Sequence, residues 1–225
     1  TNEILSANRN SLQLFDMLHS MRQFDDLTYV HSVNVALIAS ILGQWLKFSE
    51  KDIRILTISG LLHDIGKIMI PNEILTKPGK LTVAEYNIMK QHVNFGYEKV
   101  KNQNIDIRIK EACLLHHEKC DGTGYPFGLK SDHIPAVAKI IAIADVYDAM
   151  TSARVYRGAL CPFEVIDTMY KDAFTKFEPE YILPFLKNVA SSYINNDVRL
   201  SDGRIGKVVL INENALSLPI VQCED

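Results

Sequence analysis

Apolar residues recur every three or four positions along most of the chain, and strict alternation occurs only near its end. A three-to-four spacing is typical of amphipathic helices. Two helix starts carry capping signals, Ser49 with Asp52 and Thr82 with Glu85. The pattern predicts helices over residues 3–22, 26–46, 50–66, a segment from Thr82 through His92, 105–117, 134–152, 162–174 and 178–194.

The last thirty residues change character. The segment VRLSDGRIGKVVLI alternates β-branched and polar residues about Asp202-Gly203, which predicts a β-hairpin. The segment NALSLPIV is expected to add one more strand. We therefore expect a mainly α protein, with a multi-helix domain over residues 1–195 and a small C-terminal β extension over residues 196–225.

Composition narrows the function classes. The 225 residues are 47% hydrophobic with a formal net charge of −3, which argues against a binder of nucleic-acid polymers or of membrane surfaces. No run of eighteen apolar residues exists, so we expect no membrane span. The four cysteines form no Cys-x-x-Cys pair, as expected for reduced thiols in a cytoplasmic protein. The chain starts at Thr1, so we expect it to be part of a longer protein with an upstream regulatory domain.

Two ionisable doublets follow apolar runs: His63-Asp64 in LLHDIGKI and His116-His117 in LLHHEKC. Burying such side chains without partners costs free energy. A bound metal pair would satisfy them, because imidazole and carboxylate are standard ligands of first-row transition ions. The doublets therefore predict a metal centre at the ends of two helices.

The candidate ligands are spread over five predicted helices, which can converge inside a bundle. They are His31, His63, Asp64, His92, His116, His117 and Asp145. This donor mixture favours two divalent ions, iron or manganese first, with zinc, cobalt and nickel as alternatives. Two such ions would hold a hydroxide able to attack phosphorus. An oxygenase would use similar ligands, and composition alone does not separate the two reactions.

Each candidate ligand could instead have an ordinary structural role. A lone histidine such as His31 or His92 is more often a satisfied core or surface residue, and His19 and His133 keep that interpretation. Asp145 lies in the strongly apolar segment IIAIADVYDAM, where an unpaired carboxylate would be costly. Asp148, three residues later, would share its helical face.

Several ordered motifs together resemble the HD-GYP family, bacterial members of the HD metal-dependent phosphohydrolase superfamily. The motifs are YVHSVNVA around His31, HDIGK at 63–67, HHEKCDGTGYP at 116–126, IADVYDAMTSARVYR at 143–157 and KFEPEYILPFL. The resemblance extends from about Asp25 to Leu186. It implies a multi-helix HD-domain bundle that hydrolyses cyclic di-GMP to pGpG and onward to GMP.

The resemblance also implies the ligand sets. His31, His63, Asp64 and Asp145 would hold one metal, and Asp64, His92, His116 and His117 the second, with Asp64 bridging. Asp64 and Lys67 would be the catalytic residues, with the Lys67 ammonium on a phosphate oxygen. The structural alternative for Lys67 is a solvated helix-end cation.

Substrate contacts are expected on three segments. Arg154 and Arg157 resemble the family's cationic contacts, and their alternative is a solvated helix end. Gly124, Tyr125, Asp148 and Lys67 complete the expected set. The loop around Gly124-Tyr125-Pro126 could instead be a structural turn. The resemblance further implies docking of this loop onto GGDEF-type diguanylate cyclase domains, and we also consider a homodimer.

Departures from the family pattern affect the metal count and the substrate side. Some members carry a Glu four residues before the first ligand histidine, which recruits a third metal. Leu27 occupies that position here, so we expect a dinuclear centre. Cys120, Ala153 and Val155 replace commoner residues near the expected substrate contacts.

Three hypotheses remain at this point. The leading one is a metal-dependent cyclic di-GMP phosphodiesterase, with related cyclic dinucleotides as additional substrates. The second is a catalytically weak or inactive module that binds the nucleotide or a cyclase domain. The third is a di-iron oxygenase. The loop around Gly124-Tyr125-Pro126, called the GYP loop below, and the pair Arg154 and Arg157 argue against it, because they favour a phosphodiester substrate.

Overall fold

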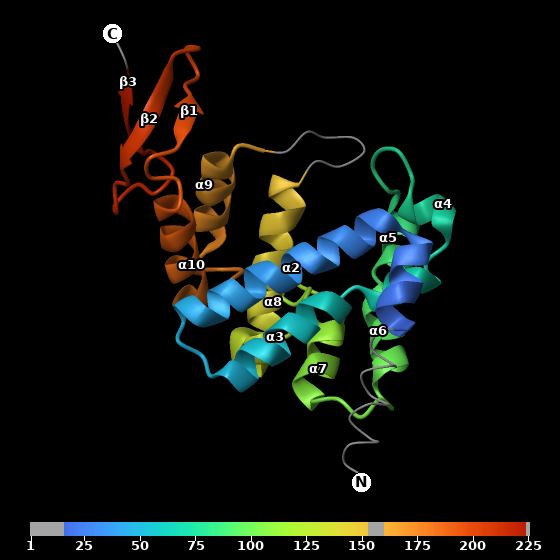
Figure 1. Ribbon diagram of the computed structural model, residues 1–225. Coiled ribbons are helices and arrows are strands. Elements are labelled where there is room, and N and C mark those ends of the chain that lie inside the picture. Colours follow the sequence, from blue (N-terminus) through green and yellow to red (C-terminus); the bar gives the residue numbers. More distant parts are fainter. Residues whose placement is uncertain (1–15, 153–159, 224–225) are drawn as a thin grey trace.

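The computed structural model describes residues 16–152 and 160–223, and it is mainly helical (Figure 1). Residues 16–24 are helical and lead into the long helix α2. The remaining elements are α2 (Asp26–Trp45), α3 (Glu50–Leu62), η1 (Ile65–Met69), α4 (Asn72–Leu75), α5 (Val83–Met89), α6 (His92–Val100), α7 (Ile107–Leu115), η2 (Ser131–His133), α8 (Ala136–Thr151), α9 (Pro162–Asp172), α10 (Pro179–Ser191), β1 (Asp197–Arg199), β2 (Ile205–Leu210) and β3 (Ile220–Cys223). The predicted fold class is confirmed.

Capping explains where the helices begin. The Ser49 side chain accepts a hydrogen bond from the amide of Asp52, and Thr82 forms a full capping box with Glu85. Both predicted capping signals are thus confirmed. Pro162 occupies the first turn of α9, where the missing amide hydrogen costs nothing.

Two predicted helices are broken at functional positions. Helix α3 ends at Leu62 instead of residue 66, and Asp64 precedes the 3-10 helix η1 with φ −99° and ψ 9°. The segment from Thr82 through His92 is two helices, α5 and α6, separated at residues 90–91. Helical periodicity does not reveal these breaks, because apolar spacing continues across both of them.

A glycine contact explains the first break. A methyl group at Gly66 would lie 1.9 Å from the carbonyl oxygen of His92 and 2.4 Å from the amide nitrogen of Gly96. Only glycine allows η1 to lie this close to α6. The close contact fixes the position of the first turn of α6 relative to the doublet that precedes η1.

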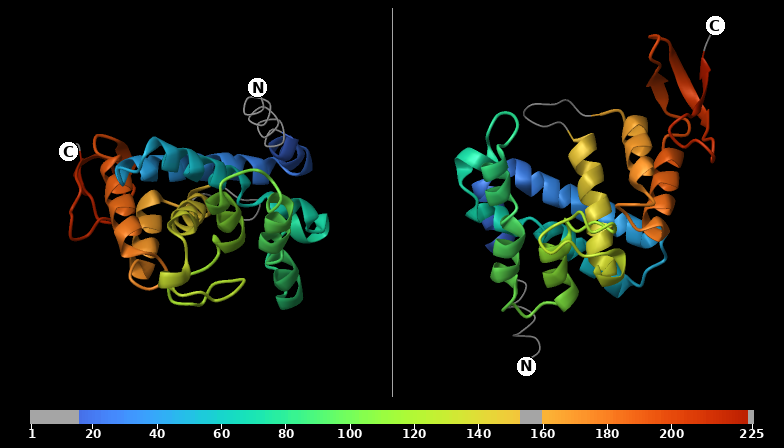
Figure 2. Two further views of the ribbon diagram at one scale, coloured as in Figure 1. Left: turned by 90° about the horizontal axis from the view of Figure 1, so that it is seen from below. Right: turned by 180° about the vertical axis from the view of Figure 1, so that it is seen from behind.

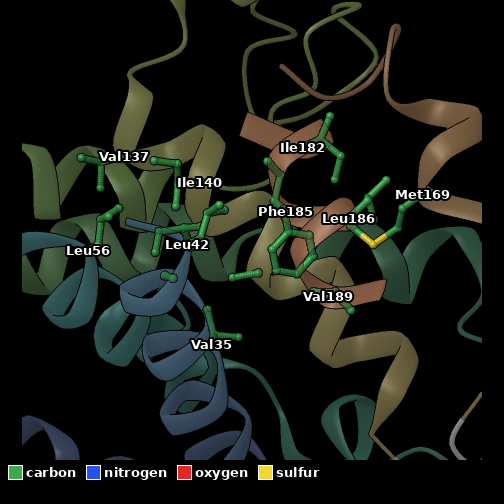
Figure 3. Packing of buried hydrophobic residues seen from close by; sticks show 14 of the residues in the cluster. Val35, Leu42, Leu56, Val137, Ile140, Met169, Ile182, Phe185, Leu186 and Val189 are labelled. Carbon is green, nitrogen blue, oxygen red and sulfur yellow. The ribbon is translucent and has the colours of Figure 1, made fainter. Parts of the chain in front are cut away.

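One hydrophobic cluster runs through the helical body. Helices α2, α3, α8 and α10 contribute its centre, where Leu42, Leu56, Ile140 and Phe185 are buried (Figure 3). Burial of apolar side chains is the main favourable contribution to folding. The helices that carry the metal-site residues are therefore held by a common core.

The C-terminal strands form a three-stranded antiparallel sheet in the order β1-β2-β3. The predicted hairpin is present, with Gly203 in its turn at φ +91°. The third strand begins at Ile220, later than NALSLPIV suggested. The sheet lies beside α9 and α10, at the opposite end of the molecule from α4 and α5 (Figures 1 and 2). Val208 joins the main core, so the sheet packs on the helical body.

In the part of the chain that the structure describes, α2 is the one helix whose length and composition would allow it to cross a bilayer. The core helix of a globular protein passes the same test, and 39% of the relevant window is buried. Helix α2 also packs against α3 and α8 and carries the candidate ligand His31. The expected lack of a membrane span stays a prediction.

Candidate metal centre

The structure brings the seven candidate ligands together. They come from α2, the end of α3, the start of α6, the end of α7 and the middle of α8. Within each of two groups the donor atoms lie within 4.8 Å of one another: Asp64, His92, His116 and His117 in one group, and His31, His63 and Asp145 in the other.

Hydrogen bonds to the backbone orient three of the imidazoles. Each donates from Nδ1 to a carbonyl oxygen three or four residues earlier: His63 to Gly60 at 2.8 Å, His92 to Met89 at 2.8 Å and His116 to Ala112 at 2.9 Å. A carbonyl only accepts, so the proton is on Nδ1 and the Nε2 lone pair is free to bind a metal. The helix ends thus select the tautomer that a metal needs.

The Asp64 carboxylate lies between the two groups. Its Oδ1 is 3.3 Å from Nε2 of His92 and 3.9 Å from Nε2 of His116. Its Oδ2 is 3.2 Å from Nε2 of His63 and 3.7 Å from Nε2 of His31. Each oxygen therefore faces a different group, which is the arrangement of a bridging carboxylate.

Two buried atoms at this position have no hydrogen-bond partner: Nε2 of His63 and Oδ1 of Asp64. The residues are 0% and 1% exposed. A buried acceptor without a partner is costly, and native proteins rarely leave one. A divalent cation between the imidazole lone pairs and the carboxylate would satisfy both atoms, so the donor set fits the predicted metals.

Burial keeps the imidazoles in the form that binds metals. It lowers the pKa of His117 to about 3, against the opposing charge of Asp145. It also lowers the pKa of His92, and that of His116 falls well below its usual value. Neutral imidazole is the ligand form, so these side chains can bind a metal without first losing a proton.

The carboxylates remain ionised despite their burial. Burial alone would raise the pKa of Asp64, but the charge of the Lys67 ammonium holds it well below its usual value. For Asp145, a hydrogen bond from His31 and the charge of that imidazole likewise outweigh burial and lower the pKa. The centre therefore combines three neutral imidazoles, those of His92, His116 and His117, with two anionic carboxylates.

Asp148 lies beside the candidate ligand His31. Its Oδ2 lies 2.6 Å from Nδ1 of His31, while Asn34 donates to its Oδ1 at 2.9 Å and Ser152 does so at the same distance. The residue is 4% exposed. The geometry thus makes Asp148 a partner that orients His31, and the expected contact of Asp148 to the substrate stays a prediction. Burial would lower the pKa of His31, but hydrogen bonds to Asp145 and Asp148 raise it to about 9.

Lys67 lies on η1 beside the centre. Its ammonium donates to Oδ2 of Asp64 at 2.6 Å, and 20% of its side chain is exposed. It is therefore directed at the bridging carboxylate and is not a solvated helix-end cation.

The GYP loop covers the second group of ligands. The Tyr125 ring stacks on His117 with centroids 4.7 Å apart and planes inclined by 29°. The amide of Tyr125 donates to the carbonyl of His117 at 3.2 Å, and the Tyr125-Pro126 bond is cis. A side chain at Gly124 would approach the backbone of Glu118 and Lys119 to 2.5 Å. Gly124 thus has a packing role that lets the loop lie against the ligand doublet.

Sequence reasoning missed two residues that support the site. Glu118 is 4% exposed and accepts hydrogen bonds from the amides of Phe127 at 2.7 Å and Leu129 at 2.9 Å, which closes the loop. Asn34 holds Asp148. Glu118 directly follows the histidine doublet, and Asn34 is three residues after His31, so both could have been found as polar neighbours of ligands.

The remaining expectations concern the two arginines and the metal count. Arg154 and Arg157 lie outside the described residues, as do Ala153 and Val155. Leu27 is 59% exposed at the position where a third metal would need a carboxylate. The described part of the chain holds two groups of candidate ligands, and the dinuclear centre stays a prediction.

The HD domain family profile matches residues 10–181. The chain is 36% identical over 203 residues to a cyclic di-GMP phosphodiesterase of Pseudomonas aeruginosa, covering 90% of this chain and 49% of the relative. It is 36% identical over 191 residues to a cyclic di-GMP phosphodiesterase response regulator of Xanthomonas campestris, covering 84% and 50%. The chain thus spans about half the length of the curated relatives it matches.

Solved structures support the fold. The HD domain of a Listeria monocytogenes phosphodiesterase, in complex with cyclic-di-AMP, superposes with a TM-score of 0.60 at 18% identity, covering 79% of this chain and 95% of that one. An HDGYP protein of Bdellovibrio bacteriovorus gives 0.58 at 23% identity, covering 69% and 50%. The family profile and the relatives at 36% identity confirm the resemblance found in the motifs: the chain belongs to the HD domain family, in its HD-GYP branch.

Proposed function

We propose that this chain is the hydrolytic domain of a metal-dependent phosphodiesterase that cleaves cyclic di-GMP to pGpG and onward to GMP. The observation that carries the proposal is the Asp64 carboxylate, whose two oxygens face two separate groups of metal-binding side chains. The relatives at 36% identity, which are named as cyclic di-GMP phosphodiesterases, support the choice of substrate.

The two groups fit two divalent ions, and iron or manganese suits this mixture of imidazole and carboxylate best, with zinc, cobalt and nickel as alternatives. His31, His63, Asp64 and Asp145 would hold one ion, and Asp64, His92, His116 and His117 the other. Bound ions would supply an activated water and neutralise charge that develops on the phosphoryl oxygens.

The protein's own residues position the substrate. The Lys67 ammonium is already held at the bridging carboxylate, from where it can donate to a phosphate oxygen of the cyclic dinucleotide. Tyr125 is fixed by stacking on His117 and would contact the substrate as it reaches the centre. Gly124 keeps the loop in place, and Arg154 and Arg157 are proposed as cationic contacts to the second phosphate.

Metal analysis together with a product assay tests the proposal. Wild-type protein prepared anaerobically with Fe²⁺ or Mn²⁺ should bind two ions and release pGpG. Asp64→Ala should lose bound metal and activity together, because both groups lose a shared ligand. Lys187→Ala, a surface ion-pair change on α10, is the matched control and should retain both.

The outcome separates the alternatives. Wild-type protein that binds two ions and cyclic di-GMP without releasing product would support the non-catalytic module instead. Turnover that requires oxygen would support an oxygenase. Full activity of Asp64→Ala would refute the bridging role.

The wider biology follows from the same proposal. We propose a cytoplasmic enzyme with reduced thiols, and all four cysteines are free in the structure. An upstream regulatory domain, docking of GGDEF-type cyclase domains on the GYP loop, and a homodimer are further proposals, which size measurements and pull-down with the full-length protein can test.

A further inference from the structure

A cation and a second aromatic ring lie beside the GYP loop. Helix α5 presents Tyr86, and Lys90 caps the same helix one turn later. The Lys90 ammonium lies 5.3 Å from the centre of the Tyr86 ring and 6.0 Å from that of Tyr125. The two tyrosine rings are 6.5 Å apart and nearly perpendicular, at 82°.

This group is continuous with the metal centre. Tyr125 stacks on the candidate ligand His117, and the Tyr125 ring contacts that of Tyr86 in turn. This series of rings leads outward from the ligands to Tyr86, a residue that is 47% exposed. Among the described residues, no carboxylate forms an ion pair with Lys90, so its ammonium has donors free for a ligand.

The chemistry fits a nucleobase. An exposed aromatic face binds any base by stacking, with little dependence on which base it is. An ammonium distinguishes the purines: guanine presents two acceptors, O6 and N7, whereas adenine presents one acceptor and an amino donor. A cation beside an open aromatic ring therefore favours guanine.

We propose that Tyr86 and Lys90 form a guanine-binding site for one base of the cyclic dinucleotide, with Tyr86 stacking on the base and Lys90 donating to its O6 and N7. The proposal rests on the proposed function, since it places the base next to a phosphate at the metal centre. It makes Lys90 a specificity-determining residue. A merely structural Lys90 would cover the two rings and would affect stability without affecting the choice of base.

The test compares cyclic di-GMP with cyclic di-AMP for wild type, Lys90→Met, Lys90→Arg, Tyr86→Leu and the surface control Lys171→Met. We expect Lys90→Met to lower kcat/KM for cyclic di-GMP about tenfold, the loss typical of one base-edge contact, and to change that for cyclic di-AMP less than about twofold. Lys90→Arg should restore the preference. Tyr86→Leu should raise KM for both substrates, and Lys171→Met should match wild type.

Binding measured in parallel with the bis-phosphorothioate analogues of both dinucleotides, which resist hydrolysis, separates this proposal from the proposed function. If wild type binds the guanine analogue more tightly than the adenine analogue but releases no product from cyclic di-GMP, the proposed hydrolase is refuted. The guanine site is then still supported, provided that Lys90→Met abolishes the binding preference. Equal losses for both dinucleotides in Lys90→Met, an unchanged preference, or no binding to wild type would overturn the guanine site. Thermal melting confirms that each variant is folded.

Discussion

The contact between Gly66 and α6 offers a sharp test of how the centre is built. Gly66→Ala adds one methyl group, far too little to change charge or ligand chemistry. That methyl would lie 1.9 Å from the carbonyl oxygen of His92, whereas real Cβ contacts essentially never fall below 3.0 Å. Either η1 or α6 must therefore move by about 1.1 Å, the difference between these two distances.

This displacement is large on the scale of metal coordination. Metal–ligand distances hold within about 0.2 Å in well-formed sites, so a shift of about 1 Å at His92 removes one ligand of the second group. Forcing a methyl into a closely packed contact also costs about 1–3 kcal/mol of stability. We therefore expect Gly66→Ala to lower the free energy of unfolding by that amount and to bind less than the full complement of metal.

The same interface supplies the control. A methyl at Gly96, on the facing helix, meets its nearest atoms at 3.4 Å or more, which is ordinary contact. Replacing a helical glycine by alanine stabilises a helix by about 1 kcal/mol. Gly96→Ala should thus be as stable as wild type or more so, with two bound ions. Urea unfolding and metal analysis measure both quantities, and a Gly66→Ala protein with wild-type stability and metal content would refute the argument.

Three further predictions concern the groups around the ligands. Asp148→Asn keeps the shape but weakens the hydrogen bond that orients His31, so metal affinity, measured by competition with a chelator, should fall about 10–100-fold; an unchanged affinity would contradict the orienting role. Lys67→Met should retain both ions and lose most of kcat, and unchanged kinetics would remove Lys67 from the proposed mechanism. Glu118→Gln removes the negative charge that strengthens the two hydrogen bonds closing the GYP loop, so KM for the cyclic dinucleotide should rise while the metal content stays constant. A loss of metal in this variant would show instead that the loop holds the ligands in place.

The sequence was sufficient to select the candidate ligands that the structure brings together, but not the residues that support them. His63, Asp64, His116 and His117 stand out because two ionisable doublets follow apolar runs, where burial without a partner is costly. The break of α3 before η1 could not be predicted, because it depends on the contact between Gly66 and a helix more than twenty-five residues later. The contact between Asp148 and His31 could not be predicted either, because the sequence places Asp148 on the helical face of Asp145 but does not show which side chain of α2 packs against that face.

The charges at the centre explain why an anionic substrate suits this arrangement. Asp64 and Asp145 are the two carboxylates among the seven candidate ligands, and both have lowered pKa values, while burial keeps His92, His116 and His117 neutral. Two divalent ions held by this set would leave a net charge of about +2, because only two negative charges come from the protein ligands. The Lys67 ammonium adds a positive charge at the bridging carboxylate, and the ionised Asp148 beside His31 offsets it. A cyclic dinucleotide, the proposed substrate, carries two phosphodiester charges, so it would match the excess positive charge that the protein leaves. A centre with additional carboxylate ligands would bind its ions equally well, but its net charge would be lower and it would attract an anionic substrate less. The imidazole-rich composition therefore favours a phosphodiester.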